Sequence, residues 1–554
     1  MKKGINVLLL LFGVIALNTI SNFVYKRFDL TEDKRFTLSQ ASLKTISAFN
    51  SPVTIDILLD GELPGEFSRL QKETVLLLEQ FRSKNTSLIY NLVNPLEEPD
   101  LREETIANLS QLGLKPASIT VEEDGKTTQE LVFPWAMVNY KNKTIKVPLL
   151  KNRLGASAED RVNNSVQNLE YAFADAFNKL QITQKKKIAV LKGNGELEDR
   201  YLADFLTTLK EYYNIGAITL DSIEKGPQEV LDQLSGFDLT LIAKPTQPFT
   251  ETEKYVLDQY ILNGGKSLWL IDQVAMELDS LFNENGSNVA VRRDLNLDDF
   301  FFKYGVRINP VLVNDLYNTP IVLANGEAKD SQYNPLPWVY HPMVFSKDDH
   351  PINNNTEALR LQFANVIDTL GNGTNKTVLL QSSPLSKTEG VPQQIGFDQL
   401  NSAVNKEDYP PHSGFPLAVL LEGKFSSAYV NRVKPVSLEK PIENGGDNKM
   451  IVVADGDIVK NQLQQGRPLE LGYDKWTNSF YGNKEFLVNC VNFLLDDTGF
   501  INIRSKGVSI PLLDVEKVAQ HKFKWQLIVI GLPIALVVLS GIVMAYVRKR
   551  RFAT

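Results

Sequence analysis

Uncharged, strongly apolar runs occupy both ends of the chain. Ile5–Val24 contains no charged residue and would be about 30 Å long as a helix, which matches the core of a bilayer. Trp525–Val547 is also uncharged, and its Trp525 and Tyr546 lie near the edges, where aromatic side chains anchor a helix at the membrane interface. We therefore predict transmembrane helices at 5–24 and 525–547.

The first run has an alternative interpretation as a signal peptide, because Lys2 and Lys3 precede it. Only the marginal Thr19-Ile20-Ser21 resembles a cleavage site, and no cysteine lies near enough for a lipoprotein signal, so we prefer an uncleaved anchor. Basic residues lie before the first run and in the tail 548–554 after the second. The positive-inside rule then places both termini in the cytoplasm and the long middle region outside it.

Both apolar runs carry residues that suit packing against other membrane helices. Small residues spaced by four let helices approach closely, and amides hydrogen-bond across an interface. The candidates are Gly531 with Ala535, Gly541 with Ala545, and the amides Asn18 and Asn22. The alternative is that small and polar residues are simply common near the ends of such runs.

After a juxtamembrane segment (25–51), the region 52–150 alternates between period-two and helical patterns. These patterns predict, in chain order, a strand at Val53–Leu59, a helix at Phe67–Phe81, a strand at Ser87–Val93, a helix at Leu101–Leu112, and three strands around Ile119, Val132 and Val147. This order is similar to a thioredoxin-type fold, including Pro116 just before a strand, where that fold has its cis-proline. Asp60–Leu63 lie where the redox cysteines would be, so we predict a binding version of the fold without thiol chemistry.

Residues 151–182 contain a strongly amphipathic helix at Glu159–Leu180, interpreted as a connector that packs against one or both domains, with a coiled coil as the alternative. In 183–499, strands and helices alternate again, which predicts a parallel sheet. Its elements are strands at 185–193, 217–220, 237–245 and 266–272, and helices at 201–212 and 253–262, the latter capped by Thr250 with Glu253 in capping-box position.

Asn, Pro and Gly are frequent at about 276–450, where only 378–381 and 417–421 are strand candidates, so this stretch is predicted to be a loop-rich insertion. The α/β pattern resumes with a strand at 450–457 and a helix at 484–495. Residues 500–524 would tether this domain to the second span. The predicted fold class is thus α/β, with two extracytoplasmic domains between two membrane helices.

Composition narrows the functional classes. The net charge of −7 is spread along the chain, which argues against a nucleic-acid partner. The single cysteine, Cys490, excludes an intramolecular disulfide, a Cys-rich zinc site and a CxxC pair, and it fits an oxidising compartment.

Two glycine-containing turns are candidates for ligand loops. Gly193-Asn194-Gly195-Glu196 follows a strand and precedes a helix, at the sheet edge where α/β proteins bind ligands, so it is a candidate for a small ligand or a peptide, with an empty loop as the alternative. Gly264-Gly265-Lys266-Ser267 resembles a phosphate loop only superficially, because it runs from helix to strand, and we interpret it as a helix C-cap.

The remaining polar candidates have ordinary structural interpretations. Asp455 and Asp457 would hold a hard cation or, more simply, cap a helix turn. His341, His350 and His412 lack metal-ligand spacing and are predicted to lie at the surface, and Cys490 is predicted to be buried on an apolar helix face. We therefore predict no catalytic site, no cofactor and no metal.

Four segments together resemble the GldG family, the gliding-motility-associated auxiliary subunit of an ABC transporter. The segments are Arg27–Ile46, Pro52–Phe67, Pro248–Asp272 and Tyr481–Gly507, and the resemblance covers essentially the whole chain. It implies an inner-membrane complex with a multi-pass permease and a cytoplasmic ATPase, since this chain has no Walker motif. It also implies a glutamine-amidotransferase-like second domain, although the cysteine–histidine machinery of that fold is missing.

The resemblance implies a non-catalytic subunit that binds a substrate or a periplasmic envelope protein. The segment around Arg27 and Asp29 would be a strap coupling the first membrane helix to the ectodomain, or an ordered linker. Two other hypotheses stay open: a structural scaffold of the motility or secretion machinery, and a degenerate hydrolase using Asp455, Asp457 or a histidine.

Overall fold

The computed structural model describes Gly13 and residues 37–123, 126–151, 154–221, 223–224, 226–325, 332–345, 350–401, 405–496, 499–505 and 515–552. The predicted first span, 5–24, with Asn18 and Asn22, lies outside the described residues apart from Gly13, and so do Arg27 and Asp29. The chain divides into two compact units, 1–507 and 508–554, which are described separately.

The first unit begins with a four-stranded sheet in the order β2-β1-β5-β6. Strand β2 runs parallel to β1, β5 runs antiparallel to β1, and β6 pairs antiparallel with β5. The elements of this part are α2 (Gln40–Ser47), β1 (Val53–Ile57), α3 (Gly65–Lys84), β2 (Leu88–Leu92), α4 (Arg102–Gln111), β3 (Ala117–Glu123), β4 (Lys126–Val132), β5 (Trp135–Tyr140), β6 (Lys143–Pro148) and α5 (Ala158–Gln181).

The strands after α4 differ from the prediction. Four strands are present where three were expected, and β3 and β4 form their own two-stranded sheet. Pro116 therefore precedes a strand outside the four-stranded sheet. The cis peptide bond among the described residues is Val391–Pro392, so Pro116 does not share the cis geometry of the proline that thioredoxin-type folds have at this place.

Helix α5 belongs to the core of this part. Its Phe177 makes edge-to-face contacts with Phe81 of α3 and with Phe49, at ring-centroid distances of 5.1 and 5.7 Å. Alternate residues of β1 are buried beneath these rings, as the period of a strand requires. The core of this part therefore includes residues that precede and residues that follow the predicted domain 52–150.

Helix α5 also contacts the next part of the chain, while its role as a connector between domains stays a prediction. The hydroxyl of Tyr212 donates to Asp175 at 2.9 Å, and Lys179 lies 2.8 Å from Glu211 and over the Tyr212 ring.

A seven-stranded sheet follows, in the order β19-β22-β23-β10-β9-β7-β8. Strands β23, β10, β9, β7 and β8 are parallel, which confirms the predicted parallel sheet, while β22 and β19 extend it in antiparallel fashion. The strands are β7 (Lys187–Lys192), β8 (Asn214–Thr219), β9 (Leu239–Ala243), β10 (Lys266–Leu270), β19 (Asn375–Gln381), β22 (Pro416–Ser426) and β23 (Asn444–Val453).

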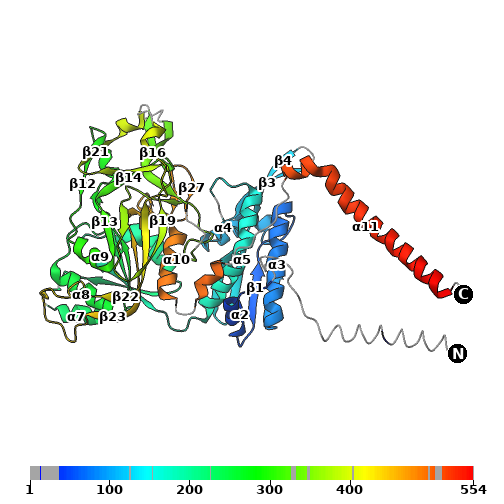
Figure 1. Ribbon diagram of the computed structural model, residues 1–554, viewed down its shortest axis with the longest axis horizontal. Coiled ribbons are helices and arrows are strands. Elements are labelled where there is room, and N and C mark those ends of the chain that lie inside the picture. Colours follow the sequence, from blue (N-terminus) through cyan, green and yellow to red (C-terminus); the bar gives the residue numbers. More distant parts are fainter. Residues whose placement is uncertain are drawn as a thin grey trace. The chain divides into compact units, whose positions relative to one another are not determined.

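Helices cover both faces of this sheet (Figure 1). One face packs against α7 (Pro227–Ser235), α8 (Glu251–Leu262) and α9 (Asp298–Tyr304). The other packs against α6 (Asp199–Leu209) and α10 (Asn483–Leu495). The capping box of Thr250 and Glu253 at the start of α8 is confirmed, whereas α7 was not predicted.

The prediction that 276–450 contains only scattered strand candidates is wrong, because short and long strands recur along the whole region. A small core around Trp338 and Tyr340 holds its strands together. Besides β19 and β22, the region between β10 and β23 contains β11 (Val274–Ala275), η2 (Leu278–Leu281), β12 (Ser287–Arg292), β13 (Val306–Asn309), β14 (Val311–Asp315), β15 (Asn318–Asn325), β16 (Gln332–Val344), β17 (Leu359–Arg360), β18 (Val366–Thr369), β20 (Ser386–Gly390), β21 (Gln393–Gly396), η3 (Phe397–Asn401) and η4 (Lys406–Asp408).

After β23 come the short elements η5 (Asp457–Val459), β24 (Leu463–Gln464), β25 (Arg467–Pro468), β26 (Tyr473–Asp474) and β27 (Ser479–Phe480), and η6 (Phe500–Ser505) follows α10. The second unit is the helix α11 (Val515–Phe552), which has a non-helical backbone at His521. Its part His521–Arg551 is long and apolar enough to cross a membrane, in agreement with the predicted second span. Gly531 and Ala535 share one face of α11, as do Gly541 and Ala545; their packing role stays a prediction.

Candidate functional site

Three neighbouring parallel strands run into charged residues at their carboxyl ends. Lys244 follows β9, Asp272 comes shortly after β10, and Asp455 and Asp457 follow β23. Because the carboxyl ends of parallel strands meet at one edge of the sheet, these side chains lie together, at the edge where open α/β sheets bind ligands.

The ammonium group of Lys244 is the centre of this cluster. Its Nζ lies 2.7 Å from Asp457, 3.3 Å from Asp272 and 2.7 Å from Glu277, and its side chain is only 3% exposed. The backbone of Lys244 has φ of 54°, a left-handed conformation that is strained for a residue with a long side chain. The three ion pairs hold it at this turn between β9 and α8.

The charges of the cluster stabilise one another. Burial alone would lower the pKa of Lys244, but the carboxylates of Asp457, Asp272 and Glu277 raise it above its ordinary value. Burial alone would raise the pKa of Asp457, but Lys244 and then Lys460 hold it below its ordinary value. The three carboxylates therefore favour the protonated form of Lys244, whereas a nucleophilic or basic lysine must lose its proton.

Asp455 caps the turn that follows β23. Its carboxylate accepts hydrogen bonds from the backbone N–H groups of Asp457, Ile458 and Gln362, at 2.7, 3.1 and 2.7 Å. This confirms the capping interpretation of Asp455. Burial, together with the nearby Asp272 and Asp457, raises the pKa of Asp455 well above its usual value.

The cation interpretation of this region meets a specific obstacle. Oxygen atoms of Asp272, Glu277 and Asp457 lie within 4.8 Å of one another, a spacing that suits a hard cation. The ammonium of Lys244, however, already contacts all three carboxylates. A lysine thus supplies the positive charge that a metal would bring.

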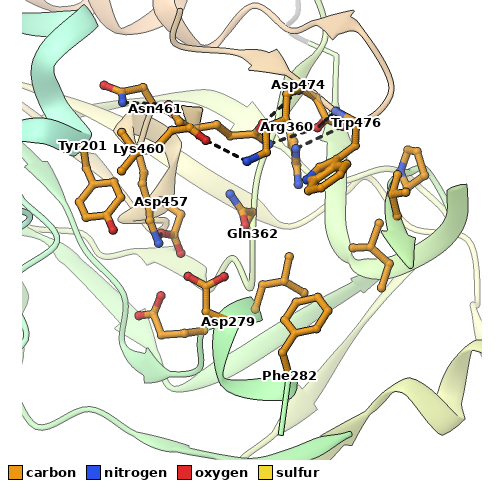
Figure 2. Close-up of a pocket in the computed structure, with 18 of the residues that line it drawn as sticks. Tyr201, Asp279, Phe282, Arg360, Gln362, Asp457, Lys460, Asn461, Asp474 and Trp476 are labelled. Carbon is orange, nitrogen blue, oxygen red and sulfur yellow. Dashed lines mark hydrogen bonds and ion pairs between the residues drawn. The ribbon is translucent and has the colours of Figure 1, made fainter. Parts of the chain in front are cut away.

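A cavity of about 470 Å³ opens beside the cluster and shares Asp457 and Glu277 with it. Figure 2 shows Tyr201, Lys460 and Asp457 on one side of the cavity and Arg360 with Trp476 on the other. Asp279 and Phe282 come from η2 and its end, and the wall beyond them comes from the hairpin β15–β16. The β-rich insertion therefore forms one wall of a cavity whose floor is the sheet edge.

Several polar groups of the lining retain hydrogen-bonding capacity. Arg360 Nη1 lies 3.6 Å from Asp474, and Lys460 Nζ lies 3.7 Å from Asp457, which are long distances for ion pairs. Within the described part of the chain, the side chains of Gln362 and Asp279 have no hydrogen-bond partner, and both line the cavity. These groups are available to a ligand.

Aromatic rings form the rim of the cavity. Tyr333 and Trp476 stack with their centroids 5.5 Å apart and their planes 25° apart, and both are more than half exposed. Phe282 is 61% exposed and lines the same cavity. Three exposed aromatic side chains around one opening are typical of a binding site.

The predicted ligand loop Gly193–Glu196 lies at another point of the same sheet edge. Neighbouring residues of the protein already contact it closely. The N–H groups of Thr246 and Gln247 donate to the carbonyl of Asn194, whose side-chain amide lies 3.2 Å from Glu253. A Cβ at Gly195 would lie 2.2 Å from the Thr246 hydroxyl. Burial raises the pKa of Glu196. Ligand binding by this loop stays a prediction.

For the other residues that the sequence analysis singled out, some predictions are confirmed and others are wrong. The C-cap is confirmed by the N–H of Gly264, which donates to Ile261 at 3.0 Å, and Cys490 is buried in α10 as predicted. His341 is fully buried, so its predicted surface position is wrong, while His350 and His412 are partly buried. Burial and the nearby Arg360 lower the pKa of His341 well below its usual value.

Sequence reasoning missed Lys244, Arg360, Trp476 and Phe282. A signal existed only for Lys244, a charged residue directly after the apolar strand 239–243 that precedes a helix. The cavity residues come from segments far apart in the chain, and no local pattern joins them.

Comparisons with known proteins give a family for this chain. No curated protein matches it. Among solved structures, the "mmIFT52 N-terminal domain" is 14% identical with a TM-score of 0.32, covering 56% of this chain and 99% of that chain. PurLQS from Thermotoga maritima is 12% identical with a TM-score of 0.24, covering 56% of this chain and 100% of that chain. At these TM-scores neither likeness carries an argument.

Two family matches divide the chain. Residues 32–139 match a domain of unknown function. Residues 185–490, which contain the sheet, the cluster and the cavity, match the family described as an ABC-type uncharacterized transport system. Because that match spans more than half of the chain, the protein belongs to the ABC-type uncharacterized transport system family.

Proposed function

We propose that the protein is a non-catalytic accessory subunit of an ABC-type transporter, which binds a substrate or an envelope partner outside the cytoplasm. The observation that carries this proposal is the family match over residues 185–490. The apolar part of α11 would attach the subunit to the membrane. The cavity beside Lys244 would be its binding site.

The geometry of the buried cluster supports a binding role rather than catalysis. Lys244 is held as a cation by three carboxylates, and Asp455 is occupied by three backbone N–H groups. Cys490 is buried in a helix, where burial raises the pKa of its thiol well above the usual value, so its reactive thiolate is disfavoured. Each of these groups thus has a structural role, in ion pairs, in backbone hydrogen bonds or in the packing of a helix.

The finer assignment follows the resemblance to the GldG family. In it, spans at 5–24 and 525–547 cross the inner membrane, both termini are cytoplasmic, and the intervening region is periplasmic. A multi-pass permease would contact the small-residue faces of α11, and a cytoplasmic ATPase would supply the energy. We also retain as proposals the thioredoxin-like domain at 52–150, the amidotransferase-like domain at 183–499, and the strap at Arg27 and Asp29.

Affinity purification of the tagged full chain from native membranes in a mild detergent tests the proposal. We expect a multi-pass permease and an ATPase to be recovered with it. Replacing Gly541 and Ala545 by leucine should reduce recovery of the permease, because larger side chains keep helices apart. Replacing Val543 and Val547 by leucine, which alters the opposite face of α11, is the matched control. Recovery of neither partner would refute the proposal.

Two further measurements separate the finer alternatives. If a ligand stimulates ATP hydrolysis by the reconstituted complex, the chain takes part in transport; if no ligand does so, the scaffold hypothesis gains. Loss of colony spreading in a strain lacking this chain would support the gliding assignment.

A further inference from the structure

The charges that line the cavity nearly cancel. Four carboxylates line it, Glu277, Asp279, Asp457 and Asp474, together with three cations, Arg360, Lys460 and Lys475. Two of the carboxylates, Glu277 and Asp457, are also paired with the buried Lys244. A phosphate or nucleotide would therefore meet carboxylates, and a polycation would meet lysines and an arginine, so neither kind of ion is favoured.

The unsatisfied groups of the lining include both donors and acceptors. Asp279 accepts, Lys460 and Arg360 donate, and the amide of Gln362 does both. Figure 2 shows Gln362 between Asp457 and Arg360, with Asp279 and Phe282 across the cavity. A hydroxyl group also donates and accepts, so a polyhydroxylated ligand would satisfy all of these groups without carrying charge.

The aromatic side chains around the cavity opening would best be buried by a ligand that also has a flat apolar surface. Trp476, Tyr333 and Phe282 each expose more than half of their side-chain surface, and burying that surface against an apolar group is favourable. The Trp476 ring stacks on Tyr333 and has Lys475 Nζ 5.0 Å from its centroid, so the exposed remainder of this pair is what a ligand would contact. A sugar ring combines these features, because hydroxyls surround its edge and C–H groups cover its faces. The volume of about 470 Å³ lies within the range of roughly 300–1,000 Å³ for small-ligand sites.

We propose that this cavity binds an uncharged glycan, whose ring packs against the exposed surface of the Tyr333–Trp476 pair and whose hydroxyls bond to Asp279, Gln362 and Lys460. This inference rests on the proposed function, since it names the ligand class of the accessory subunit. It also gives the β-rich insertion a role in binding, because the hairpin β15–β16 contributes Tyr333 and closes one side of the glycan site.

Binding is measured on the full chain in lipid nanodiscs, because the head groups of maltoside detergents are themselves sugars. The neutral probes are chitotetraose, cellotetraose and maltotetraose, and the charged comparators are ATP and tetralysine. Titration calorimetry and tryptophan fluorescence should show saturable binding of at least one glycan. Absence of saturation by all three glycans at millimolar concentration would overturn the inference, as would tighter binding of ATP or tetralysine than of every glycan.

Substitutions locate the site. Trp476→Ala should weaken glycan binding about tenfold or more through loss of the stacking surface. Phe302→Ala is the matched control, because Phe302 is an aromatic side chain on α9 that is 60% exposed and does not line the cavity. Asp279→Asn should weaken glycan binding only a few-fold, since the amide oxygen still accepts.

Thermal unfolding verifies that all variants are folded. Equal affinities of Trp476→Ala and the unaltered chain would overturn the inference. Recovery of the permease and ATPase without glycan binding would overturn this inference alone, whereas failure to recover them would refute the proposed function.

Discussion

Replacement of Lys244 by methionine removes the central charge of the buried cluster while keeping most of the side-chain volume. Asp272 and Asp457, each 4% exposed, would lose a cation at 3.3 and 2.7 Å and remain buried beside each other. Removing one partner of a buried ion pair costs about 3–5 kcal/mol, because the remaining charge is left without compensation. Methionine at φ of 54° is strained as lysine is, so the backbone contribution is nearly unchanged.

The expected result is therefore a loss of about 3–5 kcal/mol in the free energy of unfolding. Guanidinium unfolding of the full chain in nanodiscs, followed by circular dichroism, measures it. Lys192→Met at the end of the neighbouring strand β7 is the control, because the ion-pair partner of Lys192 is Asp199, which is 81% exposed, and its other contact is a neutral one, a hydrogen bond to the carbonyl of Leu197. An exposed pair contributes about 0–1 kcal/mol. Equal stability of the two variants would refute the idea that Lys244 neutralises the cluster.

Three other outcomes follow. Calcium should restore part of the stability of Lys244→Met but not of Lys192→Met, because the three carboxylates within 4.8 Å of one another would have lost the cation that contacts all of them. Absence of a calcium effect would contradict this. The pKa of His341 is lowered in the folded state, so below pH 6.5 the unfolded state binds one more proton than the folded state. The free energy of unfolding then falls by about 1.4 kcal/mol for each unit by which the pH decreases. His341→Leu should lose this slope, and an identical slope in both proteins refutes it. Thr250→Ala should lower stability by about 1 kcal/mol, whereas Thr250→Ser should keep the cap; equal losses contradict the capping role.

The elements that were predictable from sequence are those with strong local signals. The apolar spacing of Glu159–Leu180 gave helix α5 to within one residue at each end, and Thr250 with Glu253 marked the start of α8. Helix α7 was missed because it is short, although Pro227 at its first turn is a start signal.

The insertion was misinterpreted for a physical reason. Strand β16 contains Pro335, Pro337 and Pro342, and proline in a run of residues argues against a strand because it cannot donate a ladder hydrogen bond. Here the prolines are accommodated in a long hairpin strand whose other residues, Trp338 and Tyr340, form a local core. Tertiary packing outweighed the local preference.

Only the location of the candidate site was predictable from the sequence, and not the residues that line it. The rule that ligands bind at the carboxyl edge of a parallel sheet directed attention to Gly193–Glu196 and to Asp455 and Asp457. It did not reveal Trp476 or Arg360, because the fold brings them there through long-range contacts of the insertion and of the segment after η5.

The lysine among the carboxylates has a consequence for how the protein withstands its surroundings. A fold whose buried acids are neutralised by a metal depends on the supply of that ion, and chelators destabilise it. Here the counter-charge is part of the polypeptide. The sheet edge can therefore assemble as soon as the chain folds, and neither ion starvation nor a sequestering agent can take its charge away.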